Sequence, residues 1–91
     1  MSKRSPVISK IVLDVLKPHK PTIIELSKAI GNLEGVNRVN IVLREVDVTT
    51  ETVKITVEGN NLNYEEIAKV IIHFGAAIHS VDEVIVDSLI G

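Results

Sequence analysis

The ten residues from Val7 to Leu16 constrain the fold more than any other stretch of the chain. Apolar side chains fall on both faces of the strand that this stretch predicts: Ile11, Leu13 and Val15 on one face, and Ile8, Val12 and Leu16 on the other. A strand that is apolar on both faces is typical of a central strand, or of one covered on both sides. Pro18 and Pro21 end it, since proline cannot continue the ladder.

The other segments alternate between helical and strand periodicity. Apolar residues recur at helical spacing after Thr22, which has capping-box spacing to Glu25, and again after Asn63. Strand patterns cover residues 36–48, 53–58 and 77–86. This order predicts an α+β fold, a ferredoxin-like βαββαβ sandwich with a four-stranded antiparallel sheet in spatial order 4-1-3-2 and two helices on one face. We expect a single domain over residues 7–91, preceded by a disordered segment at residues 1–6.

The sheet face without helices is expected to be too apolar to remain in water. It would carry Val12, Val42, Val46, Val84 and Val86 beside the charged residues Lys10, Asp14, Arg44 and Lys54. The chain has only 91 residues, of which 45% are hydrophobic, and a domain of this size buries a modest share of its surface. We therefore expect a homo-oligomer in which a second copy covers part of this face.

Composition excludes several classes of protein. The chain has no cysteine, so disulfides and thiolate metal sites are excluded. A net charge of −2, no basic stripe and an aromatic content of 2% argue against binding to nucleic acid. No apolar run approaches the roughly 20 residues of a membrane helix, and no signal peptide is visible. We expect a soluble, cytoplasmic protein without a membrane partner.

The densest group of side chains that can bind ions or transfer protons lies in the fourth predicted strand. Asp14 should lie beside it in the sheet, so we expect a metal site formed by Asp14, His79, Asp82 and Glu83. Carboxylate oxygens are the ligands that calcium and magnesium prefer, and a divalent ion would relieve their mutual repulsion. Two alternatives remain open: the carboxylates protect an edge strand from aggregation, or Lys10 and Lys54 neutralise Asp14.

The three histidines form a second candidate group. His19, His73 and His79 all fall at the same end of the predicted sheet, which makes a three-imidazole zinc site conceivable. Histidines in loops and at helix ends are also commonly solvated. No residue is assigned a catalytic role, since Ser80 lacks a nucleophile-elbow context and no phosphate-binding glycine motif occurs.

Four motifs together resemble a known family. They are the segments 11–19 (IVLDVLKPH), 34–36 (EGV), 45–47 (EVD) and 78–84 (IHSVDEV). They are similar to the archaeal "domain of unknown function 211" family over nearly the whole chain. The resemblance implies a ferredoxin-like fold, a cytoplasmic archaeal protein, ring-like homo-oligomers and a bound divalent cation such as calcium. It brings no catalytic residues.

These observations predict a non-enzymatic, homo-oligomeric binding module. A regulatory role is one function that such a module could have. Its cation or small-ligand site would lie near the fourth strand. A purely structural or protein-interaction ring is the first alternative. A metal-dependent enzyme that uses His19 and His79 is the second.

Overall fold

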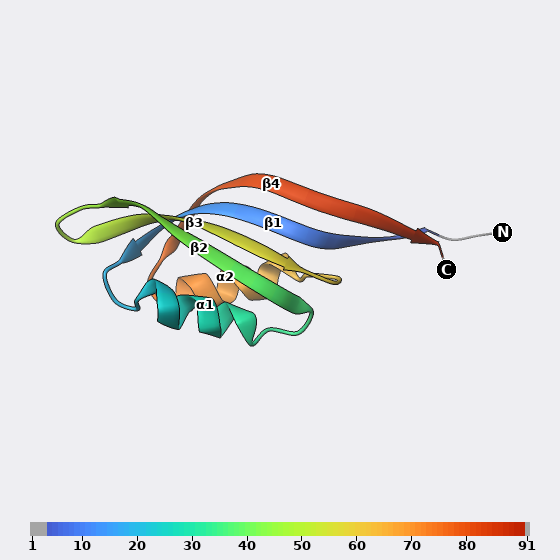
Figure 1. The fold of residues 1–91 in the computed structure, drawn as a ribbon, viewed down its shortest axis with the longest axis horizontal. Helices are drawn as coiled ribbons and strands as arrows, with labels where there is room; N and C mark the ends of the chain where they lie inside the picture. The colour runs from blue at the N-terminus through green and yellow to red at the C-terminus, as the bar shows by residue number, and fades with distance from the viewer. Residues whose placement is uncertain (1–3, 91) are drawn as a thin grey trace.

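The structure is a computed structural model that describes residues 4–90. The elements follow the predicted order, as Figure 1 shows. They are β1 (Arg4–Pro18), α1 (Ile23–Gly31), β2 (Val36–Val46), β3 (Thr50–Gly59), α2 (Tyr64–His73) and β4 (Ala77–Ile90). No helix in this part of the chain is long and apolar enough to cross a membrane.

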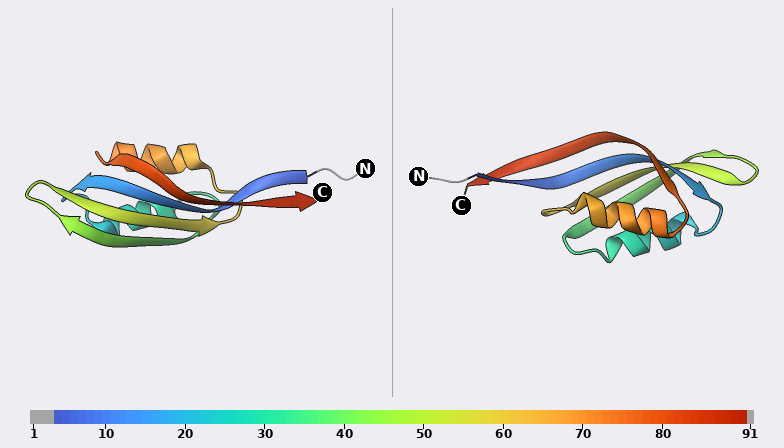
Figure 2. Two further views of the ribbon diagram at one scale, coloured as in Figure 1. Left: turned by 90° about the horizontal axis from the view of Figure 1, so that it is seen from above. Right: turned by 180° about the vertical axis from the view of Figure 1, so that it is seen from behind.

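The sheet has the predicted topology. Its strand order is β2-β3-β1-β4, and every neighbouring pair is antiparallel. Both helices pack against one face, here called the helix face, and leave the opposite, open face without a layer (Figure 2). The ferredoxin-like α+β fold and the central position of β1 are therefore confirmed.

Local capping explains where both helices begin. Thr22 accepts a hydrogen bond from the Glu25 backbone N–H at 3.2 Å, and the Glu25 side chain accepts one from the Thr22 backbone at 2.9 Å. This is the capping box that the sequence predicted. Asn63 caps α2 by accepting a hydrogen bond from the Glu66 backbone N–H at 3.1 Å. These bonds satisfy donors that the first turn of a helix leaves free.

The core lies between the two helices and the middle of the sheet. Alternate residues of β1 and β3 face it, and each helix adds a buried stripe. The fully buried apolar side chains are those of Ile11, Leu13, Val15, Leu26, Ile30, Val53, Ile55, Val57, Ile67 and Ile71.

The β1–β4 ribbon extends well past the helices, and we call its outer part, residues 4–9 of β1 and 85–90 of β4, the arm. The sequence predicted strands over 7–16 and 77–86, whereas the paired strands span Arg4–Pro18 and Ala77–Ile90. Residues 4–7 of β1 pair with residues 87–90 of β4, so both strands are longer than the apolar patterns that predicted them. Residues 4–6, which were predicted to be disordered, are therefore the first residues of β1. Residues 1–3 of the predicted disordered segment lie outside the described residues.

Bulges reverse the side-chain alternation on both edge strands. Asp82 is an extra residue of β4 between the pairs Val12–Glu83 and Leu13–Val81, and Arg44 is an extra residue of β2. A one-residue insertion moves every later side chain to the other face. Val84 therefore pairs with Ile11, and Val46 pairs with Glu51, on the helix face. Val86 pairs with Ile8, which was predicted on the opposite face but which a further bulge at Ser9 of β1 moves to the helix face, against the core. Of the five valines expected on the open face, only Val12 and Val42 lie there.

Two glycines allow the loops at the arm end of the helices to touch. The Asn60 N–H donates to the Gly35 carbonyl oxygen at 2.8 Å, and Gly35 has a φ of +86°. A Cβ on Gly59 would overlap the Gly35 carbonyl oxygen, and one on Gly35 would lie 2.6 Å from the Asn60 oxygen. The contact between the α1–β2 and β3–α2 loops therefore requires glycine at both positions.

We expect Gly59→Ala to destabilise the protein by at least about 1 kcal/mol, because the new methyl group displaces backbone. Gly31→Ala is the matched control: its Cβ would lie at ordinary van der Waals distance, 3.9 Å, from Val39 Cγ2 at the end of α1. That control should gain up to about 1 kcal/mol from the higher helix propensity of alanine. Urea unfolding followed by circular dichroism measures both changes, and equal effects would contradict the requirement for glycine.

Candidate functional site

A hollow of about 650 Å³ lies on the open face of the sheet. All four strands line it, and we call it the open-face hollow. Its lining residues are Val12, Asp14, Arg44, Glu45, Thr52, Lys54, Asp82 and Glu83. Three of the four residues predicted as metal ligands are therefore in one place.

The bulges at Asp82 of β4 and Arg44 of β2 concentrate charge in this hollow. A bulge turns two successive side chains toward one face. Asp82 and Glu83 from β4, and Arg44 and Glu45 from β2, accordingly line the same hollow from opposite edges. Four carboxylates and two cationic groups give the lining a formal charge of −2.

The carboxylates already have polar partners. The Ser80 hydroxyl donates to Asp82 Oδ1 at 2.7 Å, and Lys10 Nζ lies 3.4 Å from Glu83 Oε1. Asp14 pairs with Ser80 on β4 and with Lys54 on β3. The predicted position of Asp14 beside the fourth strand is confirmed. Of the two lysines considered as its neutralising groups, Lys54 pairs with Asp14 across the sheet, whereas Lys10 contacts Glu83.

His79 does not line the open-face hollow. It is an exposed extra residue of β4, between the pairs Asp14–Ser80 and Val15–Ile78. Within residues 4–90, no three side chains of His, Cys, Asp or Glu are arranged to hold a metal ion together. One copy of the chain thus brings together three of the four predicted ligands without a complete coordination sphere.

The three histidines do not contact one another, and each has different neighbours in the described part of the chain. The His73 ring packs edge-on against Phe74, with ring centroids 5.3 Å apart. His19 is held by hydrogen bonds to Glu51 and Val48. No three-imidazole group is formed in the described part of the chain.

A polar cluster of Lys17, His19 and Glu51 lies where β1 leaves the sheet. Lys17 is fully buried, and its ammonium group donates to Glu51 Oε1 at 2.8 Å, to the Pro18 carbonyl at 2.7 Å and to the His19 carbonyl at 3.4 Å. A lysine has three donors, so all three are satisfied. The second oxygen of Glu51 lies 3.0 Å from His19 Nδ1.

Hydrogen bonding in this cluster shifts two pKa values. The Glu51 carboxylate, and then the Val48 carbonyl, raise the pKa of His19 above its ordinary value. The His19 ring, and then the Lys17 ammonium, lower the pKa of Glu51. Each shift favours the charged form of its group.

The cluster is arranged for holding the chain rather than for proton transfer. A general base needs a free nitrogen that faces a substrate, yet His19 Nε2 is 3.0 Å from the Val48 carbonyl oxygen and Nδ1 is engaged with Glu51. The sequence analysis missed Lys17 and Glu51. The signal was their alternation: Lys17 continues the series Ile11, Leu13 and Val15, and Glu51 pairs with it on β3.

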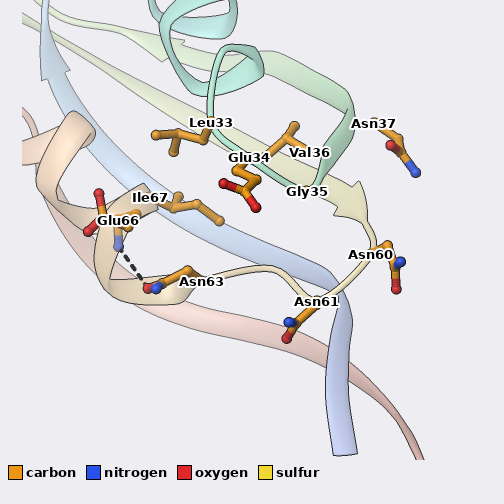
Figure 3. A pocket seen from close by; sticks show the side chains of 10 residues that line it. All are labelled: Leu33, Glu34, Gly35, Val36, Asn37, Asn60, Asn61, Asn63, Glu66 and Ile67. Carbon is orange, nitrogen blue, oxygen red and sulfur yellow. Dashed lines mark hydrogen bonds between the residues drawn. The ribbon is translucent and has the colours of Figure 1, made fainter. Parts of the chain in front are cut away.

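A second hollow, of about 760 Å³, lies between the two loops at the arm end of the helices (Figure 3). Glu34 reaches into it, and Asn63 lies on the opposite wall with its hydrogen bond to the Glu66 backbone. Leu33, Val36 and Ile67 add apolar surface. The polar side chains that line it are all exposed, so it is an open groove rather than an enclosed pocket.

Comparison with known proteins gives two matches. The family model of DUF211, described as uncharacterized ArCR, matches residues 9–90. The chain is also 47% identical over 78 residues to the uncharacterized protein MJ0319 of Methanocaldococcus jannaschii. That alignment covers 86% of this chain and 80% of the relative.

We predict that the polar cluster contributes most to stability in weak acid. Because the pKa of His19 is raised on folding, its interactions contribute fully to the free energy of unfolding below about pH 6.5, the ordinary pKa value. This contribution is lost as pH rises through the raised pKa. The lowered pKa of Glu51 gives one that is complete above about pH 4.5 and is lost as pH falls. The two overlap between these values. The difference in Tm between the native protein and His19→Gln should be largest in that window.

Thermal unfolding at a series of pH values measures this difference. His73→Gln is the control, since it removes a histidine whose ring has no hydrogen bond among residues 4–90. A Tm difference for His19→Gln that stays constant from weak acid to weak base would contradict the prediction.

Proposed function

This chain belongs to the domain of unknown function 211 family, and we propose that it is a non-enzymatic, self-associating binding module. In this proposal a second copy covers the uncovered ends of the helix face. The open-face hollow takes a divalent cation, such as calcium or magnesium, or a small cationic ligand. The arm, which extends past the helices without cover, carries the proposal (Figure 1).

The arm is the part of the fold that most needs a partner. Residues 4–7 have backbone partners on β4 alone: β3 pairs with β1 only from Lys10 onward, and the Ile8 carbonyl oxygen accepts a hydrogen bond from the Leu62 N–H at 2.8 Å. A two-stranded ribbon is at best marginally stable alone in water, and a third strand or another packed element is needed to support it. Val86 in the arm and Val84 just before it lie on the helix face, and 52% and 48% of their surfaces are exposed. Burial of one such side chain contributes about 1.5 to 3 kcal/mol.

The opposite end of the helix face also carries exposed apolar side chains. Leu43 and Val46 on β2 lie on the helix face beyond the reach of α1, and both are exposed. Two different apolar surfaces at opposite ends of one molecule favour head-to-tail association. Such association closes into a ring when the rotation between copies allows it.

Charge supports a cation in the open-face hollow. Its formal charge of −2 attracts positive ions, and Asp14, Asp82 and Glu83 offer the hard oxygen ligands that calcium and magnesium prefer. Because the described residues of one copy do not form a complete coordination sphere, water would supply the remaining ligands. The absence of a free imidazole nitrogen on His19 makes a His19-dependent enzyme the weaker alternative.

We expect the protein to be oligomeric at micromolar concentration and Val84→Asp to weaken the assembly at least about tenfold, because a charge then replaces buried apolar surface. Ile24→Asp is the control: Ile24 is 65% exposed but lies on α1, away from the arm. Sedimentation velocity over a concentration series measures both variants. A native protein that remains a monomer, or equal losses in the two variants, would contradict the assembly.

We expect calorimetric titration of metal-free protein with calcium, and separately with magnesium, to release or absorb heat. Asp82→Asn should weaken binding at least about tenfold, because it removes a charged oxygen ligand. Asp87→Asn is the control, since Asp87 is an exposed carboxylate of β4 outside the hollow. No heat with either ion would leave a ligand-free structural assembly as the function, provided that the oligomer is present.

A further inference from the structure

The His19 ring contacts two atoms that can only accept hydrogen bonds. Nδ1 lies 3.0 Å from a carboxylate oxygen of Glu51, and Nε2 lies 3.0 Å from the carbonyl oxygen of Val48. A neutral imidazole has one N–H and one bare nitrogen, whereas the protonated ring has two N–H donors. Both hydrogen bonds can therefore form at the same time only when the ring is protonated.

We propose that protonated His19 holds the tip of the β2–β3 hairpin against the exit of β1, and that loss of this single proton to solvent releases the tip. The tip is residues 47–49. This proposal concerns other residues than the open-face hollow. The tip adjoins Val46, at the end of the helix face that a second copy would cover in the proposed assembly, but its attachment to His19 lies within one copy of the chain.

The tip has few other attachments. Asp47 N–H donates to the Thr50 carbonyl at 2.8 Å, and Val48 N–H lies 3.3 Å from Asp47 Oδ1, so both bonds stay within the hairpin. Among residues 4–90, the bond from His19 to Val48 is the side-chain hydrogen bond that joins the tip to another element. Val48 itself is 90% exposed, so packing adds little to hold it.

Deprotonation breaks one particular bond of the two. A neutral ring keeps its proton where the acceptor is strongest, and a charged carboxylate is a better acceptor than a backbone carbonyl. The neutral ring therefore keeps its proton on Nδ1, and Nδ1–H continues to donate to Glu51. The bare Nε2 then faces the Val48 carbonyl oxygen, lone pair against lone pair, and the tip moves away.

The charged groups around His19 come from every neighbouring element. Glu51 on β3 favours the protonated ring through its hydrogen bond and its charge, and the backbone of Val48 and Asp47 in the hairpin also favours it. Two cationic groups are close by: Lys17 on β1 bonds to Glu51 and to the His19 carbonyl oxygen, and Lys20 follows His19 in the chain. Glu25 in the first turn of α1 lies near the two lysines. Lys17 keeps Glu51 in place after the ring loses its proton, because its own bond to Glu51 Oε1 at 2.8 Å does not involve His19. The change is thus confined to the tip.

Nuclear magnetic resonance of the intact protein tests this proposal. The ring nitrogens of His19 and the backbone amides of Val48 and Thr49 are followed through a titration from about pH 5 to about pH 9. We expect the order parameters of the two amides to fall from about 0.85 to below about 0.6 with the same midpoint as the His19 ring. Order parameters are used because exchange rates of amide protons change with pH on their own.

Variants at the three histidines provide the controls. In His19→Gln the tip should be mobile at every pH, whereas His73→Gln and His79→Gln should keep the native transition. Amides of the tip that stay rigid while the His19 ring titrates would overturn the proposal, and so would a transition that persists in His19→Gln. If His19→Gln does not fold, the titration of the native protein decides by itself.

Discussion

The pairing of β1 with β4 over nearly their full lengths is the constraint on which the rest of the structure depends. A strand rises about 3.3 Å per residue, so the 15 residues of β1 span roughly 50 Å. Helices rise about 1.5 Å per residue, so the 9 residues of α1 and the 10 of α2 each span only about 15 Å. Two such helices can cover only the middle of this sheet, and its two ends remain without a second layer.

Much of this arrangement could be predicted from the sequence, because its signals are local. The capping residues Thr22 and Asn63 mark where the helices begin, and the alternation of Val53, Ile55 and Val57 marks β3. The right-handed crossover rule then leaves one strand order. That order was sufficient to bring Asp14 next to Ser80, and thus to locate the open-face hollow.

The remaining features depend on register, which no local pattern specifies. The bulges at Arg44 and Asp82 are single-residue insertions, and each moves the following side chains to the opposite face. The same bulges add Arg44 and Glu45 to the hollow. The pair of Lys17 and Glu51 was missed for another reason: charged side chains are rarely fully buried, and both residues fell outside the predicted strands, Lys17 just after residues 7–16 and Glu51 just before residues 53–58.

The bulges also separate the two surfaces that the proposed function uses. Without the bulge at Asp82, β4 would alternate regularly from Val81 onward, and Val84 and Val86 would lie on the open face beside Asp82 and Asp14. Any partner that covered them would then also have to desolvate those charges. With it, the apolar side chains of the arm lie on the helix face and the charges lie opposite. A second copy can then cover the arm without burying an unpaired carboxylate, and the hollow stays open to ions. Assembly and ligand binding are in this way able to occur on one small sheet without competing for the same face.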